Sequence, residues 1–335
     1  MPPYPLPGKT VLITGAAGGI GRACARALHA RGAHLALAGR DASSVATLAR
    51  ELGEGRTLPL SADVTDRAAL QEAVARTVDR FGRLDVVFAN AGSAPARPAT
   101  LATVDPAVFE HVIEVNLLGV WRTVRAALPQ IAAHRGHVLV NASVYAYVNG
   151  AVNAAYAASK AAVEQLARAL RVELSPHGAT AGVLYPGWVA TGMARPVFGG
   201  DELATRMREI GFPRPLAAAV PPEAVARRVV RGIERRSASI TVPRRWQPVG
   251  ILRGLVNPLC DRLLIRDREL RPLLRALESA ATDATPADDV PGPRLPPAPA
   301  GPRDAAPHPP AAAPERPGSR ADPAPPQPGR PGTHR

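Results

Sequence analysis

Hydrophobic and polar positions alternate regularly over the first two thirds of this chain. From Lys9 to about Val242, short apolar runs are separated by longer stretches in which apolar residues recur every three or four positions. Short apolar runs are typical of buried strands, and the longer period is that of amphipathic helices. The pattern therefore predicts an α/β fold in which a parallel sheet is flanked by helices.

Seven strands and six helices are expected in this region. The strands are predicted at Thr10–Thr14, His34–Ala38, Thr57–Leu60, Asp85–Ala89, His137–Asn141, Thr180–Leu184 and Ile240–Val242. The helices are predicted near Ile20–Arg31, Ser43–Leu52, Arg67–Phe81, Pro106–Ala133, Val152–Leu174 and Pro222–Arg235. Strands joined by crossover helices form a doubly wound, Rossmann-type sheet, whose ligands bind beyond the carboxyl ends of the strands.

Composition divides the chain into three parts. Residues 1–245 carry the alternating pattern, residues 246–285 form a basic segment with helical patterns, and residues 286–335 hold 17 of the 37 prolines. This last part, here called the tail, cannot bury enough apolar surface to offset its ordering entropy, so we expect it to be disordered. Trp188–Ala219 interrupts the alternation, and we expect it to cover a ligand with one short helix.

The net charge of +13 raises the question of a nucleic-acid partner. Thirteen arginines and four acidic residues lie between Arg227 and Arg275, with few aromatic side chains for base stacking. We therefore expect no nucleic-acid binding. The two distant cysteines and the eight histidines have no ligand spacing, so no metal site is expected. The N-terminus lacks a basic start and an apolar run, which predicts a cytoplasmic protein without a signal peptide.

A glycine-rich turn follows the first predicted strand. Its sequence, Thr-Gly-x3-Gly-x-Gly, comprises Thr14, Gly15, Gly19, Ile20 and Gly21 and leads directly into a helical pattern. Glycines allow a tight turn and let a pyrophosphate approach the free N–H groups of the helix start, whose dipole favours negative charge. In this context the turn predicts a dinucleotide-binding site.

The end of the second strand bears on the choice of dinucleotide. An acidic residue there would bind the ribose 2′-hydroxyl of NAD, whereas this strand ends at Gly39 and Arg40. A guanidinium can bind a 2′-phosphate through two hydrogen bonds, which favours NADP(H). Two alternatives stay open: Arg40 as a solvated loop residue, and Asp41 turned onto the ribose, which would favour NAD(H). Asp41 could instead cap the following helix.

Tyr156 and Lys160 are expected one turn apart on the same helix face. Lys9 and Lys160 are the two lysines among 41 basic residues, and no other tyrosine has a lysine four residues later. A phenol with a pKa of about 10 exchanges protons poorly at neutral pH, and a neighbouring cation lowers that pKa. The pair therefore predicts acid–base chemistry at Tyr156. Ser143, thirteen residues earlier, could donate a hydrogen bond to a substrate oxygen.

Taken in order, these motifs resemble the active site and cofactor site of the classical short-chain dehydrogenase/reductase family over roughly residues 8–245. The resemblance adds further positions: Asp63 and Val64 at the adenine, the Asn90-Ala91-Gly92 motif, Asn116, and Pro186, Gly187 and Thr191 on the nicotinamide side. It implies that Ser143, Tyr156, Lys160 and Asn116 are catalytic, with Asn116 holding a proton-relay water. Tyr156 and Lys160 would also contact the cofactor. The implied activity is hydride transfer between NADP(H) and a carbonyl or alcohol.

Two other functions are alternatives to hydride transfer. A nucleotide-binding regulator or scaffold on the same fold would need neither Tyr156 nor Lys160, and both are present. A dehydratase or epimerase of the related extended type usually carries a shorter glycine spacing, so the spacing from Thr14 to Gly21 argues against that type. The apolar residues of Trp188–Ala219 predict an apolar substrate, such as a long-chain aldehyde, a steroid or a polyketide-like ketone.

Two features of the sequence predict contacts with other subunits or with a membrane. The patterns at Pro106–Ala133 and Val152–Leu174 correspond to helices by which family members commonly pair, so a homodimer or homotetramer is expected. Residues 249–277 mix arginines with apolar residues, and one helix face would carry Leu270, Leu273, Leu274 and Leu277. Either these leucines pack on the Rossmann-type domain or a partner subunit, or the segment contacts an anionic membrane with its arginines at the headgroups.

Overall fold

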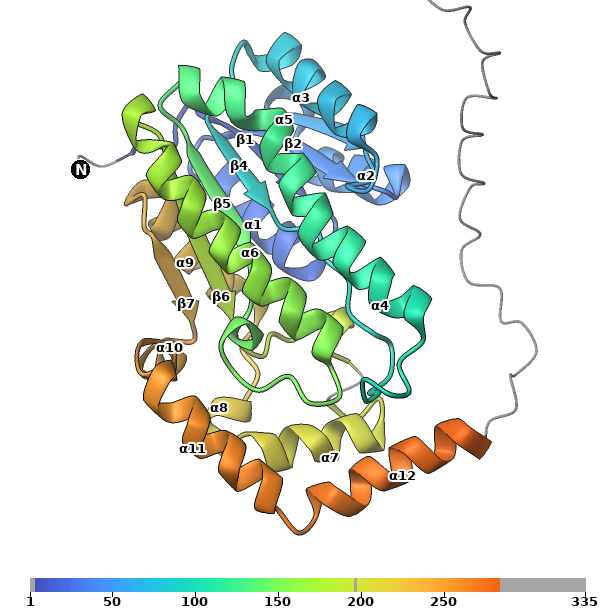
Figure 1. The fold of residues 1–335 in the computed structure, drawn as a ribbon. Coiled ribbons are helices and arrows are strands. Elements are labelled where there is room, and N and C mark those ends of the chain that lie inside the picture. The colour runs from blue at the N-terminus through green and yellow to red at the C-terminus, as the bar shows by residue number, and fades with distance from the viewer. Residues whose placement is uncertain (1–3, 196–197, 284–335) are drawn as a thin grey trace, which may run out of the picture. The chain divides into compact units, whose positions relative to one another are not determined.

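A seven-stranded parallel sheet forms the centre of the computed structural model, which describes residues 4–195 and 198–283 (Figure 1). The strands are β1 (Thr10–Thr14), β2 (His34–Gly39), β3 (Thr57–Ser61), β4 (Val86–Ala89), β5 (His137–Asn141), β6 (Thr180–Pro186) and β7 (Ser239–Val242). Their order is β3-β2-β1-β4-β5-β6-β7. The predicted doubly wound fold is confirmed. The disorder predicted for the tail falls on residues outside the described ones.

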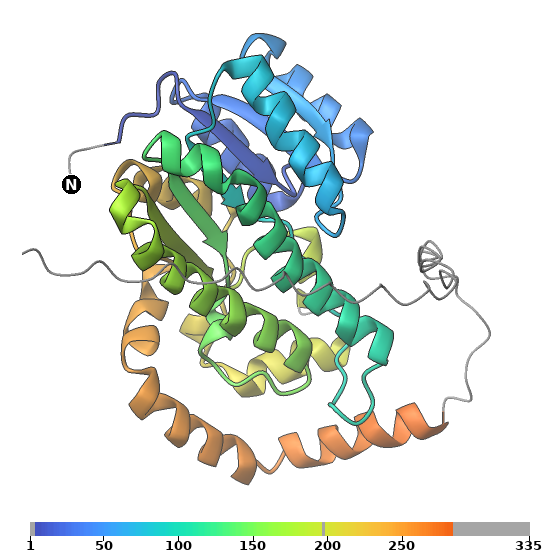
Figure 2. The same cartoon turned by 45° about the horizontal axis from the view of Figure 1, so that its top comes forward.

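Helices cover both faces of the sheet (Figures 1 and 2). Those of the alternating region are α1 (Gly19–His29), α2 (Ala42–Leu52), α3 (Arg67–Phe81), α4 (Pro106–Ile113), α5 (Gly119–Ala133), α6 (Ala154–Glu173) and α9 (Pro222–Glu234). Successive residues of a strand point to opposite faces. Accordingly, Leu12 packs in the apolar cluster beneath α3, α5 and α6, while Val11 and Ile13 pack in the cluster beneath α1, α2 and α9.

Local capping explains where several helices begin and end. Asp41 caps α2 by accepting hydrogen bonds from the backbone N–H groups of Ser43 and Ser44, at 2.9 and 3.2 Å. Asp66 caps α3 in the same way, and α3 ends at Gly82, whose φ of 74° favours glycine. These are the short-range signals that make the observed bounds agree closely with the predicted ones.

The long helix predicted at Pro106–Ala133 contains a π-helical turn. This turn, Glu114–Leu118, joins α4 to α5, and Asn116 is fully buried within it. Turns of this kind are uncommon and are often found at functional sites, because the extra residue re-aims a side chain. The sequence pattern predicted the helix but not the turn that sets the direction of Asn116.

Two further groups of helices lie beyond the carboxyl ends of the strands (Figure 1). Trp188–Ala219 holds α7 (Glu202–Gly211) and α8 (Arg214–Ala217), two short helices where one was expected. After β7 come α10 (Gln247–Ile251), α11 (Arg253–Arg266) and α12 (Leu270–Asp283). Leu270 is buried and Leu273, Leu274 and Leu277 are half-buried, so the leucine face of α12 is turned toward the protein. No helix of residues 4–195 and 198–283 is long and apolar enough to cross a bilayer.

Candidate active site

A cavity of about 740 Å³ lies at the carboxyl ends of the strands and brings most of the predicted site residues together. The predicted residues that line it are Gly15, Gly19, Ile20, Gly21, Asn90, Ala91, Gly92, Ser143, Tyr156, Lys160, Pro186, Gly187 and Thr191. Five predicted residues are absent from its lining: Thr14, Arg40, Asp63, Val64 and Asn116. Of these five, Thr14 and Asn116 hydrogen-bond residues or neighbours of residues that line the cavity, whereas Arg40, Asp63 and Val64 lie at the ends of β2 and β3.

The glycine-rich turn has no room for side chains at Gly15, Gly19 and Gly21. A Cβ on Gly19 would lie 2.5 Å from Thr191 Cγ2, and one on Gly21 would lie 2.2 Å from the carbonyl oxygen of Gly15. Gly15 has a φ of 62°, which glycine adopts readily. The N-cap of α1 is Gly18, which has no side chain to bond the first amides of the helix. Those N–H groups are therefore available to phosphate oxygens, and the residues present fit a dinucleotide.

Hydrogen bonds of Thr14 and Asn90 fix the base of the glycine-rich turn. Thr14 Oγ1 accepts hydrogen bonds from the backbone N–H groups of Asn90 and Ala91, at 3.1 and 3.2 Å. The Asn90 side-chain amide donates to the Thr14 carbonyl at 3.0 Å and accepts a hydrogen bond from Asn141 Nδ2 at 3.0 Å. These bonds tie the ends of β1, β4 and β5 together. The sequence analysis did not assign Asn141 a role, although its polar side chain at the end of an apolar strand was a signal.

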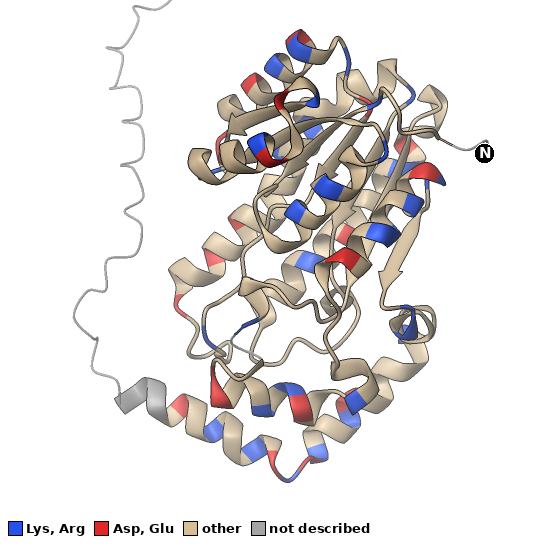
Figure 3. Cartoon of the chain, turned by 180° about the vertical axis from the view of Figure 1, so that it is seen from behind, with Lys and Arg blue, Asp and Glu red and all other residues tan. Residues whose placement is uncertain are grey.

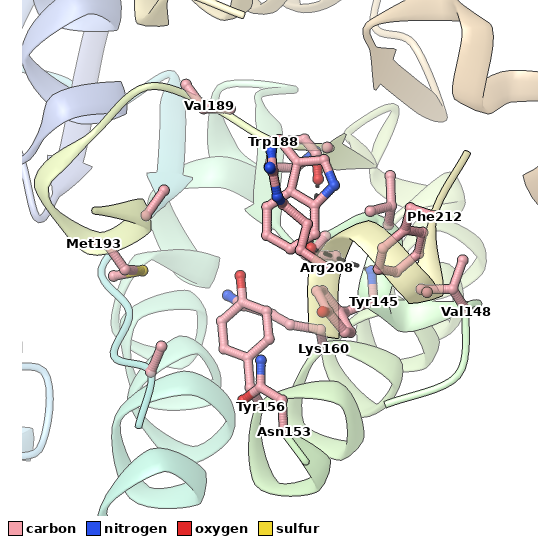
Figure 4. A pocket seen from close by; sticks show the side chains of 18 of the residues that line it. Tyr145, Val148, Asn153, Tyr156, Lys160, Trp188, Val189, Met193, Arg208 and Phe212 are labelled. Atoms are coloured by element: carbon pink, nitrogen blue, oxygen red, sulfur yellow. Dashed lines mark hydrogen bonds between the residues drawn. The ribbon is translucent and has the colours of Figure 1, made fainter. Parts of the chain in front are cut away.

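Tyr156 and Lys160 lie one turn apart on α6 and both reach the cavity (Figure 4). The Lys160 ammonium is 5.4 Å from the centroid of the Tyr156 ring and donates a hydrogen bond to the Asn141 carbonyl at 2.8 Å. Its side chain is almost fully buried, and this burial lowers the pKa of Lys160 to about 8. A buried ammonium beside an open cavity is a suitable partner for an anionic or hydroxyl-bearing ligand.

Burial also sets the titration of Tyr156. Removal from water raises the pKa of the Tyr156 phenol, and a hydrogen bond with the Ser143 side chain acts in the opposite direction. The sequence predicted that Lys160 lowers this pKa, whereas in the structure desolvation raises it and the opposing contribution comes from Ser143. Tyr156 is therefore protonated at neutral pH, the form that can give a proton to a substrate oxygen.

The fully buried side chain of Asn116 lies close to Lys160. Its side chain accepts a hydrogen bond from the Ser93 backbone N–H at 2.7 Å and donates to the Ser93 carbonyl at 2.9 Å. It also donates to Ser159 Oγ at 3.0 Å. A Cβ on Gly92 would lie 3.2 Å from Asn116 Oδ1 and 3.6 Å from Lys160 Nζ, which places Asn116 and Lys160 around the same glycine. The sequence analysis did not single out Ser159, which connects the π-helical turn to α6.

The predicted adenine-side residues follow β2 and β3, whose ends are paired at Gly39 and Ser61. Arg40 is exposed there. The cap that Asp41 provides to α2 also lowers its pKa to about 2, chiefly through hydrogen bonds from Ser44 and Ser43. Asp63 Oδ1 accepts hydrogen bonds from the backbone N–H and hydroxyl of Thr65, at 2.9 and 2.8 Å.

Val64 is buried against α5. A Cβ added to Gly119, at the start of α5, would lie 2.7 Å from Val64 Cγ2. The side chain of Val64 is therefore fixed by packing, and its backbone is what remains to contact a ligand at this edge of the sheet.

Tyr145, Trp188, Phe212 and Trp246 line the other end of the cavity, and Phe198 packs edge-on against Trp188. These five side chains are here called the aromatic cluster. Tyr145 contacts the Tyr156 ring edge-on at 5.8 Å between centroids, so the cluster begins beside the predicted acid (Figure 4). Trp188 and Phe212 come from the predicted covering segment. Tyr145 and Trp246 were not predicted, because nothing in the sequence indicates which distant aromatic residues meet.

The extension after β7 also contributes to the wall. Val249, Val256, Cys260, Leu264 and Leu270, from α10 to α12, all line the cavity. This segment was not predicted to reach the site, because it lies outside the region of resemblance and has no motif of its own. No group of three or more His, Cys, Asp or Glu side chains that could hold a metal ion is found among the described residues.

Comparison with known proteins agrees with the fold and identifies the family. The family model for short chain dehydrogenase matches residues 9–201. Dehydrogenase/reductase SDR family member 7B of Bos taurus is 35% identical over 193 residues, which cover 55% of this chain and 59% of that protein. Momilactone A synthase of Oryza sativa subsp. japonica is 36% identical over 200 residues, 59% of this chain and 73% of that protein.

A solved structure extends the comparison to three dimensions. A short-chain dehydrogenase/reductase from Burkholderia phymatum in complex with NAD matches with a TM-score of 0.66 at 24% identity, over 75% of this chain and 94% of that one. The fold and the glycine turn define a Rossmann-type nucleotide-binding protein. This chain belongs to the short-chain dehydrogenase/reductase family, and its motifs are those of the classical members. The matched region spans about three fifths of the Bos taurus relative.

Proposed function

We propose that this protein is an NADP(H)-dependent oxidoreductase that interconverts a carbonyl and an alcohol on an apolar substrate. The observation that carries this proposal is the meeting of three features in one cavity: the uncapped start of α1, the Tyr156–Lys160 pair and the aromatic cluster. The first suits a pyrophosphate, the second suits proton transfer, and the third suits an apolar substrate.

The roles of the individual side chains follow from their positions. A bound nicotinamide would supply or accept the hydride. Tyr156 would give its hydroxyl proton to the substrate oxygen during reduction, while Ser143 Oγ donates a hydrogen bond to the same oxygen. Lys160 would hold the nucleotide ribose and stabilise the phenolate left on Tyr156. Asn116, fixed by Ser93 and Ser159, would position the water through which the proton returns.

The preference for NADP(H) rests on the end of β2. Asp41 accepts the hydrogen bonds that begin α2, and turning it onto a ribose would break them. Arg40 is exposed at the same strand end and is free to pair with a 2′-phosphate. Both observations support NADP(H) over NAD(H).

A second candidate, a nucleotide-binding regulator or scaffold without turnover, shares the fold and the glycine turn. It would have no use for a buried ammonium and a phenol that lie together at the wall of an apolar cavity. The placement of Lys160 and Tyr156 therefore supports the oxidoreductase.

We also propose that the protein forms a homodimer or homotetramer through α4, α5 and α6. These helices carry apolar side chains on their outer surfaces: Val108, Leu118, Trp121 and Val172 are between 36 and 73% exposed. Exposed large apolar side chains on surface helices can mark a protein interface.

A direct test mixes the protein with NADPH and a panel of apolar aldehydes and ketones and follows NADPH absorbance. We expect at least one apolar ketone to be reduced, with little turnover of small hydrophilic carbonyls. NADPH that binds but is consumed with none of the panel would support the regulator or scaffold instead.

A further inference from the structure

Helices α10 and α11 direct a row of apolar side chains away from the protein. The row consists of Ile251, Leu252, Leu255, Leu259 and Leu263, here called the outer face, whose members are between 52 and 76% exposed. Leu252, Leu255, Leu259 and Leu263 are spaced by three and four residues, which places them on one side of α11, and Ile251 ends α10 beside them. Surface helices of globular proteins usually bury such a row, whereas α11 leaves it exposed and turns Val256, Cys260 and Leu264 on its other side toward the cavity.

Polar contacts on the opposite side hold α11 in this orientation. Arg253 forms an ion pair with the buried carboxylate of Glu164 on α6, at 2.8 Å. Asp261 accepts a hydrogen bond from Asn149 Nδ2 at 2.9 Å. A rotation of α11 that buried the leucines would break both interactions and leave the buried carboxylate of Glu164 with only its longer ion pair to Arg168, at 4.0 Å.

The charged residues beside the outer face are basic. Arg262 and Arg266 are exposed and lie among the leucines on the helical projection of α11. The nearest acidic groups are engaged elsewhere: Asp261 bonds Asn149, and Asp267 accepts hydrogen bonds from the backbone N–H groups that begin α12. Figure 3 shows the basic positions along α11 and α12.

This charge pattern discriminates between the surfaces that could cover the leucines. A second copy of the same face would bring arginine against arginine, because a two-fold interface pairs a patch with itself. Anionic lipid headgroups would instead neutralise Arg262 and Arg266 while the leucines enter the acyl boundary.

We propose that the outer face of α10 and α11 docks onto the surface of an anionic lipid bilayer. The docked helix is also a wall of the cavity, since Val256, Cys260 and Leu264 line it from the other side of α11. Docking would bring the cavity to apolar molecules dissolved in the bilayer. This last consequence rests on the proposed oxidoreductase activity, whereas the docking itself does not.

Vesicle sedimentation tests the proposal with the full chain. We expect the protein to pellet with phosphatidylcholine vesicles that contain phosphatidylglycerol, to pellet much less with phosphatidylcholine alone, and to be released by high salt. The double variant Leu255→Glu, Leu259→Glu should lower the partition coefficient about tenfold or more, because two carboxylates would replace inserted leucines. Leu101→Glu is the matched control, since Leu101 is equally exposed in a different part of the molecule, and should bind as the wild type does.

Neutralising the arginines gives a second readout. Arg262→Gln and Arg266→Gln should each weaken binding to the anionic vesicles about fivefold and reduce its salt dependence. Arg50→Gln and Arg76→Gln, exposed positions on α2 and α3, should change neither. Thermal melting and turnover of a water-soluble substrate should stay unchanged in the leucine variant, because neither leucine lines the cavity.

Several results would overturn the proposal. Wild-type protein that stays in the supernatant with anionic vesicles at low salt would do so, as would a leucine double variant that pellets like the wild type. A double variant that halves the particle mass in light scattering would show that a second copy covers this face. Vesicle binding without any NADPH turnover would leave the docking intact and would count against the oxidoreductase alone.

Discussion

Lys160 combines two properties that seldom occur together in one side chain. Its ammonium is nearly inaccessible to water, yet it lies at the wall of a cavity that can receive a ligand. The cost of burying that charge lowers its pKa to about 8. A nucleotide bound next to the ammonium would stabilise the charged form of Lys160. Nucleotide binding and protonation of Lys160 should therefore be coupled.

The coupling predicts how nucleotide affinity depends on pH. Lys160 is charged below its pKa of about 8 and neutral above it, so NADPH affinity should be constant at neutral pH and weaken as the pH rises through that value. Fluorescence titration of the Kd from neutral to alkaline pH checks this. Lys160→Met should bind weakly with a flat profile, while Lys9→Met should keep the wild-type profile. A wild-type Kd that is independent of pH would contradict the assigned role.

Arg40 provides a prediction about cofactor choice. Arg40→Ala removes a charge-assisted hydrogen bond to a 2′-phosphate, which is worth about 1.5–3 kcal/mol. The Kd for NADPH should therefore rise about tenfold to a hundredfold while the Kd for NADH stays nearly constant. Arg50→Ala, a neighbouring exposed arginine on α2, should affect neither. Equal losses of affinity for both nucleotides would show that Arg40 attracts either nucleotide and does not bind a 2′-phosphate.

Among the elements, the turn between β1 and α1 is defined by backbone packing. Gly15, Gly19 and Gly21 are each in close contact with other backbone or side-chain atoms of the site. The sequence predicted this turn because its glycines, the preceding strand and the following helix are all local signals. It did not predict the π-helical turn that directs Asn116, since an insertion of one residue leaves the apolar pattern of α4 and α5 almost unchanged.

The packing of the turn predicts a contrast between two glycines. Gly19→Ala would place a Cβ 2.5 Å from Thr191 Cγ2, so α1 or the Thr191 loop has to move at a cost of about 1–3 kcal/mol. NADPH binding should weaken markedly and the melting temperature should fall. Gly55→Ala, where a Cβ meets nothing within 4 Å, should leave both unchanged. Calorimetric titration and thermal melting measure the two effects, and equal behaviour of the variants would refute this view of the turn.

For the whole molecule, the sequence predicted the sheet more completely than the site. Seven apolar runs and the helices between them follow from periodicity, which is a local property of the chain. The cavity, in contrast, also depends on Tyr145, Trp246 and the α10–α12 segment, which meet only through tertiary packing. No local pattern shows which side of α11 faces the protein, because both sides carry apolar residues and the ion pair of Arg253 is with Glu164, far away in sequence. The cytoplasmic location stays a prediction.

Oligomerisation is a prediction at this scale. Light scattering at micromolar concentration should give two or four times the monomer mass of 35.0 kDa. Trp121→Glu, which replaces the exposed indole of α5 with a charge, should shift the protein toward the monomer. Leu101→Glu, exposed outside these helices, should not. A wild-type monomer would exclude pairing through α4, α5 and α6.

The central claim is that Tyr156 transfers the proton in a hydride-transfer reaction, and Tyr156→Phe tests it most directly. The variant removes one hydroxyl and keeps the ring that packs against Tyr145 and Lys160. With a ketone that the wild type reduces, turnover should fall about 10²- to 10⁴-fold while the Kd for NADPH stays the same. Tyr147→Phe, which removes a buried hydroxyl that does not line the cavity, should retain wild-type turnover. Substantial turnover by Tyr156→Phe would contradict the account.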